Sequence, residues 1–167
     1  FNNSGTVEVQ EGTLQVAGQI VQSGTIEVAS EAVFQRTGGF TNGGMLSGDG
    51  TINLGTGNFL INQGTIAPGR VSGDRTGVLS ITGNLTQTPT GIVDIEIDGS
   101  ATGNYDVLAV SGTANLGGSL RVSGMGDEGT FSVLTASAVS GVFSNVVAAG
   151  GFLVTDQYSA SAVTLST

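Results

Sequence analysis

The chain has 167 residues, 29 of them glycine, and a net charge of −9 that arises from 13 acidic and 4 basic residues. It contains no cysteine, histidine or lysine, which excludes disulfides, thiol catalysis, Schiff-base chemistry and the usual zinc sites. An acidic surface repels nucleic-acid phosphates and anionic lipids, and no stretch approaches the roughly 20 apolar residues of a membrane helix. We therefore expect no nucleic-acid partner and no direct membrane insertion.

A short phrase recurs along the first part of the chain: glycine, then threonine, then an alternation of apolar and polar residues. Each copy predicts a turn followed by a strand of about five residues, because alternation buries one face of a strand. One such unit cannot bury its apolar face alone, so the units must stack into a β-solenoid. The copies begin at Gly5, Gly12, Gly24, Gly50 and Gly64.

The rest of the chain is predicted to continue as strands and to end differently. Aromatic residues make up only 5% of the chain, which suits a narrow core of Val, Ile, Leu and Ala. Phe131, Phe143, Phe152 and Tyr158 nevertheless cluster near the C-terminus. Bulky residues at one end of a solenoid favour a cap or a sandwich-like terminus.

Five phrases in the second half of the chain also carry a family resemblance. In this order they resemble the C-terminal part of autotransporter passenger domains and of related large bacterial surface proteins, over about residues 45–167. The resemblance implies a right-handed parallel β-helix, last rungs that act as a folding seed (an autochaperone region), and a place outside the bacterial cell or on its surface. It carries no catalytic residue onto this chain. The phrases are QGTIAPG at 63–69, GVLSITGNLTQ at 77–87, YDVLAVSG at 105–112, ANLGGSLRV at 114–122 and GTFSVLTA at 129–136.

Together these patterns predict an all-β fold: a right-handed parallel β-solenoid with a β-rich, sandwich-like C-terminal end. We expect solenoid rungs over residues 1–124 and a capping β region over 125–167, either separate or as one continuous domain. Because the first residue is Phe1 rather than Met, we expect a processed form or a piece of a longer protein.

One acidic strand face is the main candidate for chemistry. Asp94, Glu96 and Asp98 alternate with apolar residues, so they share one face, and Asp106 follows on the next predicted strand. Oxygen ligands that converge in this way make these three residues calcium candidates, and alternate residues on a strand lie about 6.6 Å apart, within the range of an inverting carboxylate pair. The favoured interpretation is a solvated acidic face with no enzymatic activity and no cofactor.

The favoured function is structural. Open rung edges expose unpaired backbone groups that another chain can complete by adding a strand. We predict an extracellular module of a bacterial surface or matrix protein, a rod that associates into fibres through its ends. The predicted partners are copies of itself or the rest of a longer passenger. The predicted contact residues are Phe1, Val7 and Val9 in the first rung, and Phe152, Val154, Val163 and Leu165 in the C-terminal strands.

Three other functions remain open at this stage. The chain could be an adhesin fragment that binds a polysaccharide or a host surface through its sides. It could serve as an autochaperone segment that folds the rest of a passenger. It could also be a polysaccharide-degrading β-helix enzyme, which the absence of histidine and lysine and the few aromatic residues disfavour.

Overall fold

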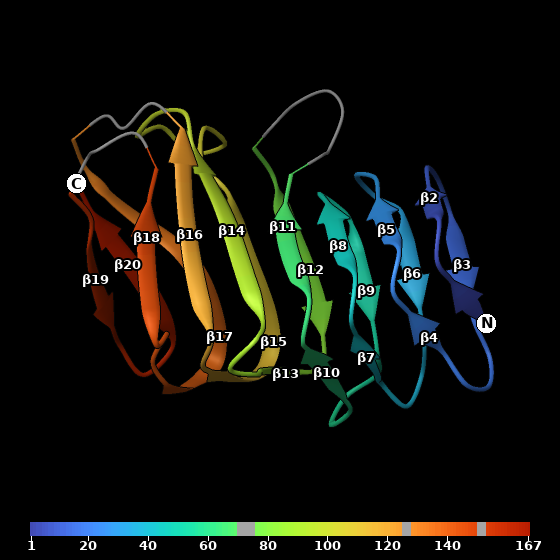
Figure 1. Ribbon diagram of the computed structural model, residues 1–167. Helices are drawn as coiled ribbons and strands as arrows, with labels where there is room; N and C mark the ends of the chain where they lie inside the picture. The colour runs from blue at the N-terminus through green and yellow to red at the C-terminus, as the bar shows by residue number, and fades with distance from the viewer. Residues whose placement is uncertain (70–75, 125–127, 150–152) are drawn as a thin grey trace.

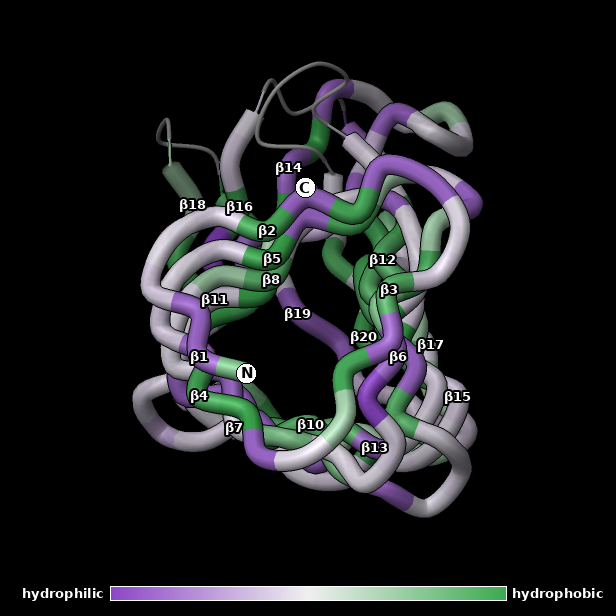
Figure 2. The backbone as a smooth tube through the Cα atoms, turned by 90° about the vertical axis from the view of Figure 1, so that its right-hand side faces the viewer, coloured by the Kyte–Doolittle hydropathy of each residue, from purple (hydrophilic) through white to green (hydrophobic). Residues whose placement is uncertain are grey.

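The chain forms an all-β coil (Figure 1), seen in a computed structural model that describes residues 1–69, 76–124, 128–149 and 153–167. Each turn of the coil contributes three strands, and strands of successive turns pair in parallel. Viewed from the N-terminal end, the chain runs clockwise as it recedes from the viewer, so the coil is right-handed (Figure 2). The predicted right-handed parallel β-solenoid is confirmed.

The strands stack into three faces. The seven-stranded sheet forms one face, and the curled larger sheet forms the other two. The first face of the larger sheet contains β1 (Asn2–Asn3), β4 (Val21–Gln22), β7 (Phe40–Asn42), β10 (Phe59–Asn62) and β13 (Asn84–Gln87). Its other face contains β3 (Thr13–Gln15), β6 (Val33–Gln35), β9 (Thr51–Asn53) and β12 (Val78–Thr82). The seven-stranded sheet contains β2 (Thr6–Val9), β5 (Thr25–Val28), β8 (Met45–Gly48), β11 (Thr65–Pro68), β14 (Ile92–Ile97), β16 (Ser119–Gly124) and β18 (Asn145–Ala148).

Two long strands join the faces of the larger sheet. They are β15 (Val107–Leu116) and β17 (Thr130–Gly141), and each shifts register part-way along its length, where it turns from one face to the next. Because β17 pairs with β15 in parallel, the larger sheet continues past residue 124. The boundary predicted there therefore falls within continuous sheets.

The core is a set of apolar columns that run along the axis. Pairing in register places Ile26, Leu46 and Ile66 directly above one another, and all three are fully buried. The alternate residues of the same strands point outward, as the alternation in the sequence predicts. Branched aliphatic side chains of similar size suit this arrangement, because each one packs on its equivalent in the next rung.

The C-terminal end departs from the solenoid pattern. There β19 (Thr155–Tyr158) and β20 (Ala162–Ser166) form an antiparallel hairpin, and β20 also pairs antiparallel with β17. Phe131 is fully buried here, and its ring lies 5.4 Å from that of Tyr105. Among the described bulky residues, Phe131, Phe143 and Tyr158 pack in or against the core at this end, where the antiparallel hairpin forms a cap as the sequence predicts. In the described part of the chain, no helix is long and apolar enough to cross a membrane.

Candidate functional site

The two ends of the solenoid differ in how well their cores are covered. At the N-terminal end, Val7 and Leu14 are only partly buried, whereas their register partners Ile26 and Phe34 in the second rung are fully buried. At the C-terminal end the cap covers the core, and Leu165 is fully buried. We therefore define the N-terminal end, formed by β1, β2 and β3, as the candidate docking surface.

All three strands of this end are edge strands. In the sheet order β1 and β3 stand at the two ends of the larger sheet, and β2 stands at an end of the seven-stranded sheet. Within the coil, Thr25 donates its backbone N–H to Gly5 O at 2.8 Å, and Met45 donates to Gly24 O at the same distance. The N–H of Thr25 thus points toward the rung before it. Because Thr6 is in register with Thr25, the N–H and C=O of Thr6 point in the same direction, away from the second rung. Such groups are a template for another strand.

A ladder of buried amides runs inside the coil from this end. Asn3, Gln22, Asn42, Asn62 and Gln87 occupy equivalent inward positions, and each is at least 95% buried. We call these five residues the amide ladder. Buried amides are stable only when their polar atoms find partners, and here each of the first four side chains donates to the next rung.

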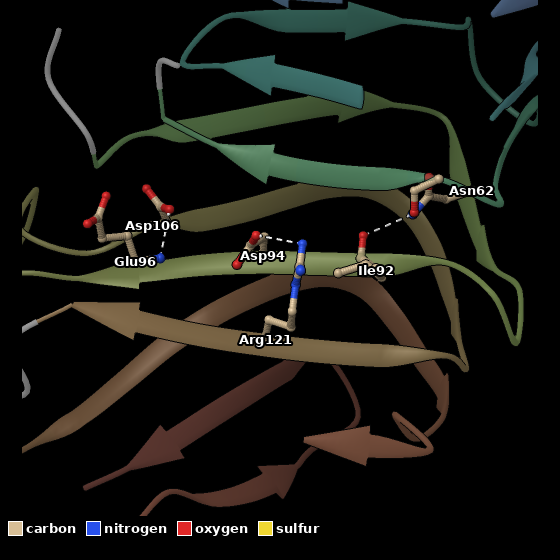
Figure 3. A network of polar contacts seen from close by, with 7 residues as sticks. Asn62, Ile92, Asp94, Glu96, Asp106 and Arg121 are labelled. Carbon is tan, nitrogen blue, oxygen red and sulfur yellow. Dashed lines mark hydrogen bonds and ion pairs between the residues drawn. The ribbon is translucent and has the colours of Figure 1, made fainter. Parts of the chain in front are cut away.

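The amide ladder has a direction. The amide nitrogen of Asn3 donates to Gln22 Oε1 and to Thr25 O, both at 2.9 Å. Asn42 likewise donates to Asn62 Oδ1 at 2.8 Å, and Asn62 donates to Gln87 Oε1 at 2.9 Å. Asn62 also donates to Ile92 O at 3.1 Å (Figure 3). Donors thus point toward the C-terminus and acceptors toward the N-terminus.

A column of glycines lies beside the ladder. Two residues after their ladder amides stand Gly5, Gly24, Gly44 and Gly64, and we call these four the glycine column. A Cβ on Gly24, Gly44 or Gly64 would lie 2.0–2.1 Å from the carbonyl oxygen of the preceding glycine in the column. A Cβ on Gly5 would meet nothing within 4 Å. The close approach of successive rungs therefore requires glycine everywhere except in the first.

Phe1 covers part of the open end. Its ring centroid lies 6.3 Å from that of Phe34, which in turn lies 6.0 Å from that of Phe40. Phe1 remains 43% exposed, and Val9 is buried. The three predicted contact residues Phe1, Val7 and Val9 therefore lie together at the open end.

The predicted contact residues at the other end lie differently. Val163 and Leu165 are fully buried, and β20 pairs with a neighbour on each side. A strand paired on both sides offers no free edge, so we do not keep these two residues as contacts. Val154 packs against the core, and Phe152 lies outside the described residues.

The acidic face does not form a converged site. Asp94 pairs with Arg121 at 2.9 Å (Figure 3), and both side chains are partly exposed. Asp98 is exposed at the end of its strand. Among the described residues, no three acidic groups are placed to hold a metal ion. We therefore do not carry the calcium candidates Asp94, Glu96 and Asp98 into the proposed function.

Asp106 is the unusual acid of this region. It is only 2% exposed, and its carboxylate accepts hydrogen bonds from the backbone N–H groups of Glu96 at 2.9 Å and Gly77 at 2.8 Å. Burial raises the pKa of Asp106 from 3.8 to about 7, although the two hydrogen bonds oppose this shift. Asp106, Asp94 and Glu96 also line a surface hollow of about 200 Å³. The role shown by these contacts is to tie β12 and β14 together.

This raised pKa predicts how stability depends on pH. Between about pH 4 and pH 7, native Asp106 holds a proton that the unfolded chain has lost, so its contribution to stability falls as the pH rises through this window. Urea unfolding at pH 5 and pH 8 measures the effect. In an Asp106→Asn variant the pH-dependent difference is expected to shrink, whatever the variant's absolute stability. An equal pH dependence in both proteins would contradict this assignment.

Sequence reasoning missed the amide ladder and the glycine column. The signal was present as Asn or Gln followed two residues later by glycine, at residues 3, 22, 42 and 62. The glycines of these pairs predict turns, and polar residues beside glycine are typical of turns, so the amides do not stand out in the sequence.

No model of a known protein family matches the chain, and no curated protein matches it.

Proposed function

We propose that the chain is a non-enzymatic structural module of a bacterial surface or matrix protein, located outside the cell. It is a short β-solenoid rod that associates end to end by adding strands at its N-terminal end. Its partners are copies of itself or the rungs of another β-solenoid, such as the rest of a longer passenger. The family resemblance supports the location and the passenger partner.

One observation carries this proposal: the contrast between the two ends. The N-terminal end has three edge strands and a partly covered core. Among the described residues, the C-terminal end also has edge strands, β18 and β19, but an antiparallel hairpin covers the core there. Natural proteins usually protect such edges, because they pair readily with other chains. An edge that lies next to open apolar side chains gives an incoming strand both backbone hydrogen bonds and a surface to bury.

Gly5→Ala is expected to block association without harming the fold. An alanine Cβ at this position meets nothing within 4 Å in the free chain. An incoming rung would bring a backbone carbonyl to about 2 Å from that Cβ, as Gly5 O would lie 2.1 Å from a Cβ on Gly24. Sedimentation velocity at rising protein concentration should show association of the parent chain, lost in the variant, with unchanged thermal stability.

Ser4→Ala is the matched control. Ser4 is exposed, and its equivalents Ser23 and Gln63 remain exposed in rungs that are stacked on a preceding rung, so this change should leave association intact. The charge offers a second check. Because the chain carries −9, added salt should strengthen association between copies. A parent chain that stays monomeric at every concentration and salt level would contradict self-association.

A second candidate function, as an autochaperone region, has its own supporting observation. The strands lengthen toward the C-terminus, from two to four residues in the first rung to ten in β15 and twelve in β17. Long strands beneath a closed cap form a more stable unit than short open rungs, and such a unit could seed the rungs before it. Secretion of a longer passenger that fails when residues 125–167 are deleted would favour this role.

A further inference from the structure

We propose that the N-terminal end selects its partner through the amide ladder: the preferred occupant is a parallel β-solenoid rung with Asn or Gln opposite Asn3. This inference rests on the proposed end-to-end association and specifies the chemistry of the partner. The inference concerns side-chain hydrogen bonds in the interior of the contact between the first rung and an added rung. These bonds are distinct from the backbone pairing of the edge strands.

The repeat shows what each rung supplies to the next. In every step of the ladder, the amide nitrogen of one rung donates to a backbone carbonyl just after the next ladder residue. Gln22 donates to Met45 O at 3.3 Å and Asn42 to Thr65 O at 3.2 Å. In three of the four steps the amide nitrogen also donates to the next amide oxygen. A rung therefore offers acceptors on its N-terminal side and donors on its C-terminal side.

The first rung presents the acceptors of this pattern. In the second rung, the acceptors of the Asn3 amide are Gln22 Oε1 and Thr25 O. Their register equivalents in the first rung are Asn3 and Thr6, so Asn3 Oδ1 and Thr6 O are the corresponding acceptors there. Asn3 Oδ1 accepts the backbone N–H of Gly5 at 3.2 Å. Asn42 Oδ1 accepts the backbone N–H of Gly44 in the same way, although Asn42 is an inner member of the ladder. The complement of this pattern is an amide donor on an adjoining rung.

A rung without such a donor would leave these acceptors with fewer partners. Once a rung covers them, Asn3 Oδ1 would keep only the N–H of Gly5, and Thr6 O would keep only the backbone N–H of the incoming strand. A lost hydrogen bond at a buried site lowers stability. An aliphatic side chain opposite Asn3 would bury more apolar surface but would donate to neither oxygen. The contact between the rungs therefore favours an amide over an isosteric apolar residue.

The chain's own C-terminal end does not supply this donor. The ladder stops at Gln87, because Leu116 occupies the next position and Gly141 the one after it. The Nε2 of Gln87 is buried with no hydrogen-bond partner among the described residues. A copy of this chain is consequently the weaker partner. A β-solenoid whose terminal rung carries Asn or Gln at the ladder position is the stronger one.

An added rung tests the selection directly. A copy of residues 20–39 fused before Phe1 stays in register with the first rung. In the parent chain this segment is followed by Phe40, which stands two residues before Asn42, and Phe1 likewise stands two residues before Asn3. The copied Gln22 then faces Asn3. Three versions carry Gln, Asn or Leu at that position, and thermal unfolding followed by circular dichroism gives the Tm of each beside the parent chain.

The Gln and Asn versions are expected to melt about 2–4 °C above the Leu version, and all three above the parent. Burial of apolar surface alone predicts the reverse order between Leu and the amides, so the order is decisive. A Leu version that melts at or above the Gln version would overturn the selection while leaving end docking intact. If no version melts above the parent, both the selection and the docking surface fail.

Discussion

Replacing Gly44 with alanine is expected to destabilise the chain strongly. The new Cβ would lie 2.0 Å from Gly24 O and 2.6 Å from the carbonyl carbon of Ser23. Both atoms belong to the backbone of the preceding rung, between β4 and β5, so relief requires two rungs to separate. We expect a loss of about 3 kcal/mol or more in the free energy of unfolding, measured by urea denaturation.

Gly5→Ala is the control for this prediction. Gly5 holds the same place in the repeat, and neither glycine has a positive φ, so backbone strain does not distinguish them. A difference between the two variants therefore isolates the contact between rungs. Equal destabilisation by both changes would mean that glycine is needed at this turn for a reason within a single rung, and the stacking argument would be wrong.

Asn42→Leu is expected to have the second large effect. Asn42 Nδ2 donates to Gly44 O at 3.1 Å, Asn62 Oδ1 at 2.8 Å and Thr65 O at 3.2 Å, and the site is fully buried. Leucine has a similar size but cannot donate, so several buried acceptors lose their partner. A loss of about 2–4 kcal/mol is expected in the same denaturation experiment.

Gln87→Leu provides the comparison within the ladder. Gln87 is its last member, its Nε2 has no partner among the described residues, and leucine already occupies the next position at Leu116. Its Oε1 accepts from Asn62, which also donates to Ile92 O. The expected loss is about 1 kcal/mol. If Gln87→Leu proved as harmful as Asn42→Leu, the ladder's end would not differ from its middle.

Much of the fold could be predicted from the repeat alone. Alternating strands that each follow a glycine turn have no way to bury their apolar face except by stacking, so Ile26, Leu46 and Ile66 fall into one column. The order of the strands on the three faces follows from the same repeat. The bulky residues near the C-terminus also correctly indicated a cap.

The arrangement of the cap could not be predicted in the same way. A strand such as β20 has one alternating pattern whether it is an edge or a central strand, because alternation reports which face is buried and says nothing of how many neighbours pair with it. The reversal of direction at β19 and β20 places Val163 and Leu165 inside the molecule. The sequence had suggested an exposed contact there.

The amide ladder was hidden for a related reason. The turns between its members differ in length, so Gln87 comes 25 residues after Asn62 whereas Asn62 comes 20 after Asn42. Irregular spacing hides a column that only the stacking of rungs creates. Alternation likewise places Asp94 and Glu96 on one strand face, but it does not report whether their side chains converge on one point.

Hydrogen exchange at β2 tests the central claim most directly. In a dilute solution of the chain, the backbone amides of Thr6 and Glu8 should exchange rapidly, because no strand pairs with that edge, while Thr25, bonded to Gly5 O, is protected. At concentrations where the chain associates, both amides should become protected. Amides that are already slow in the dilute chain, or that stay fast in the associated one, would contradict the N-terminal end as the docking surface.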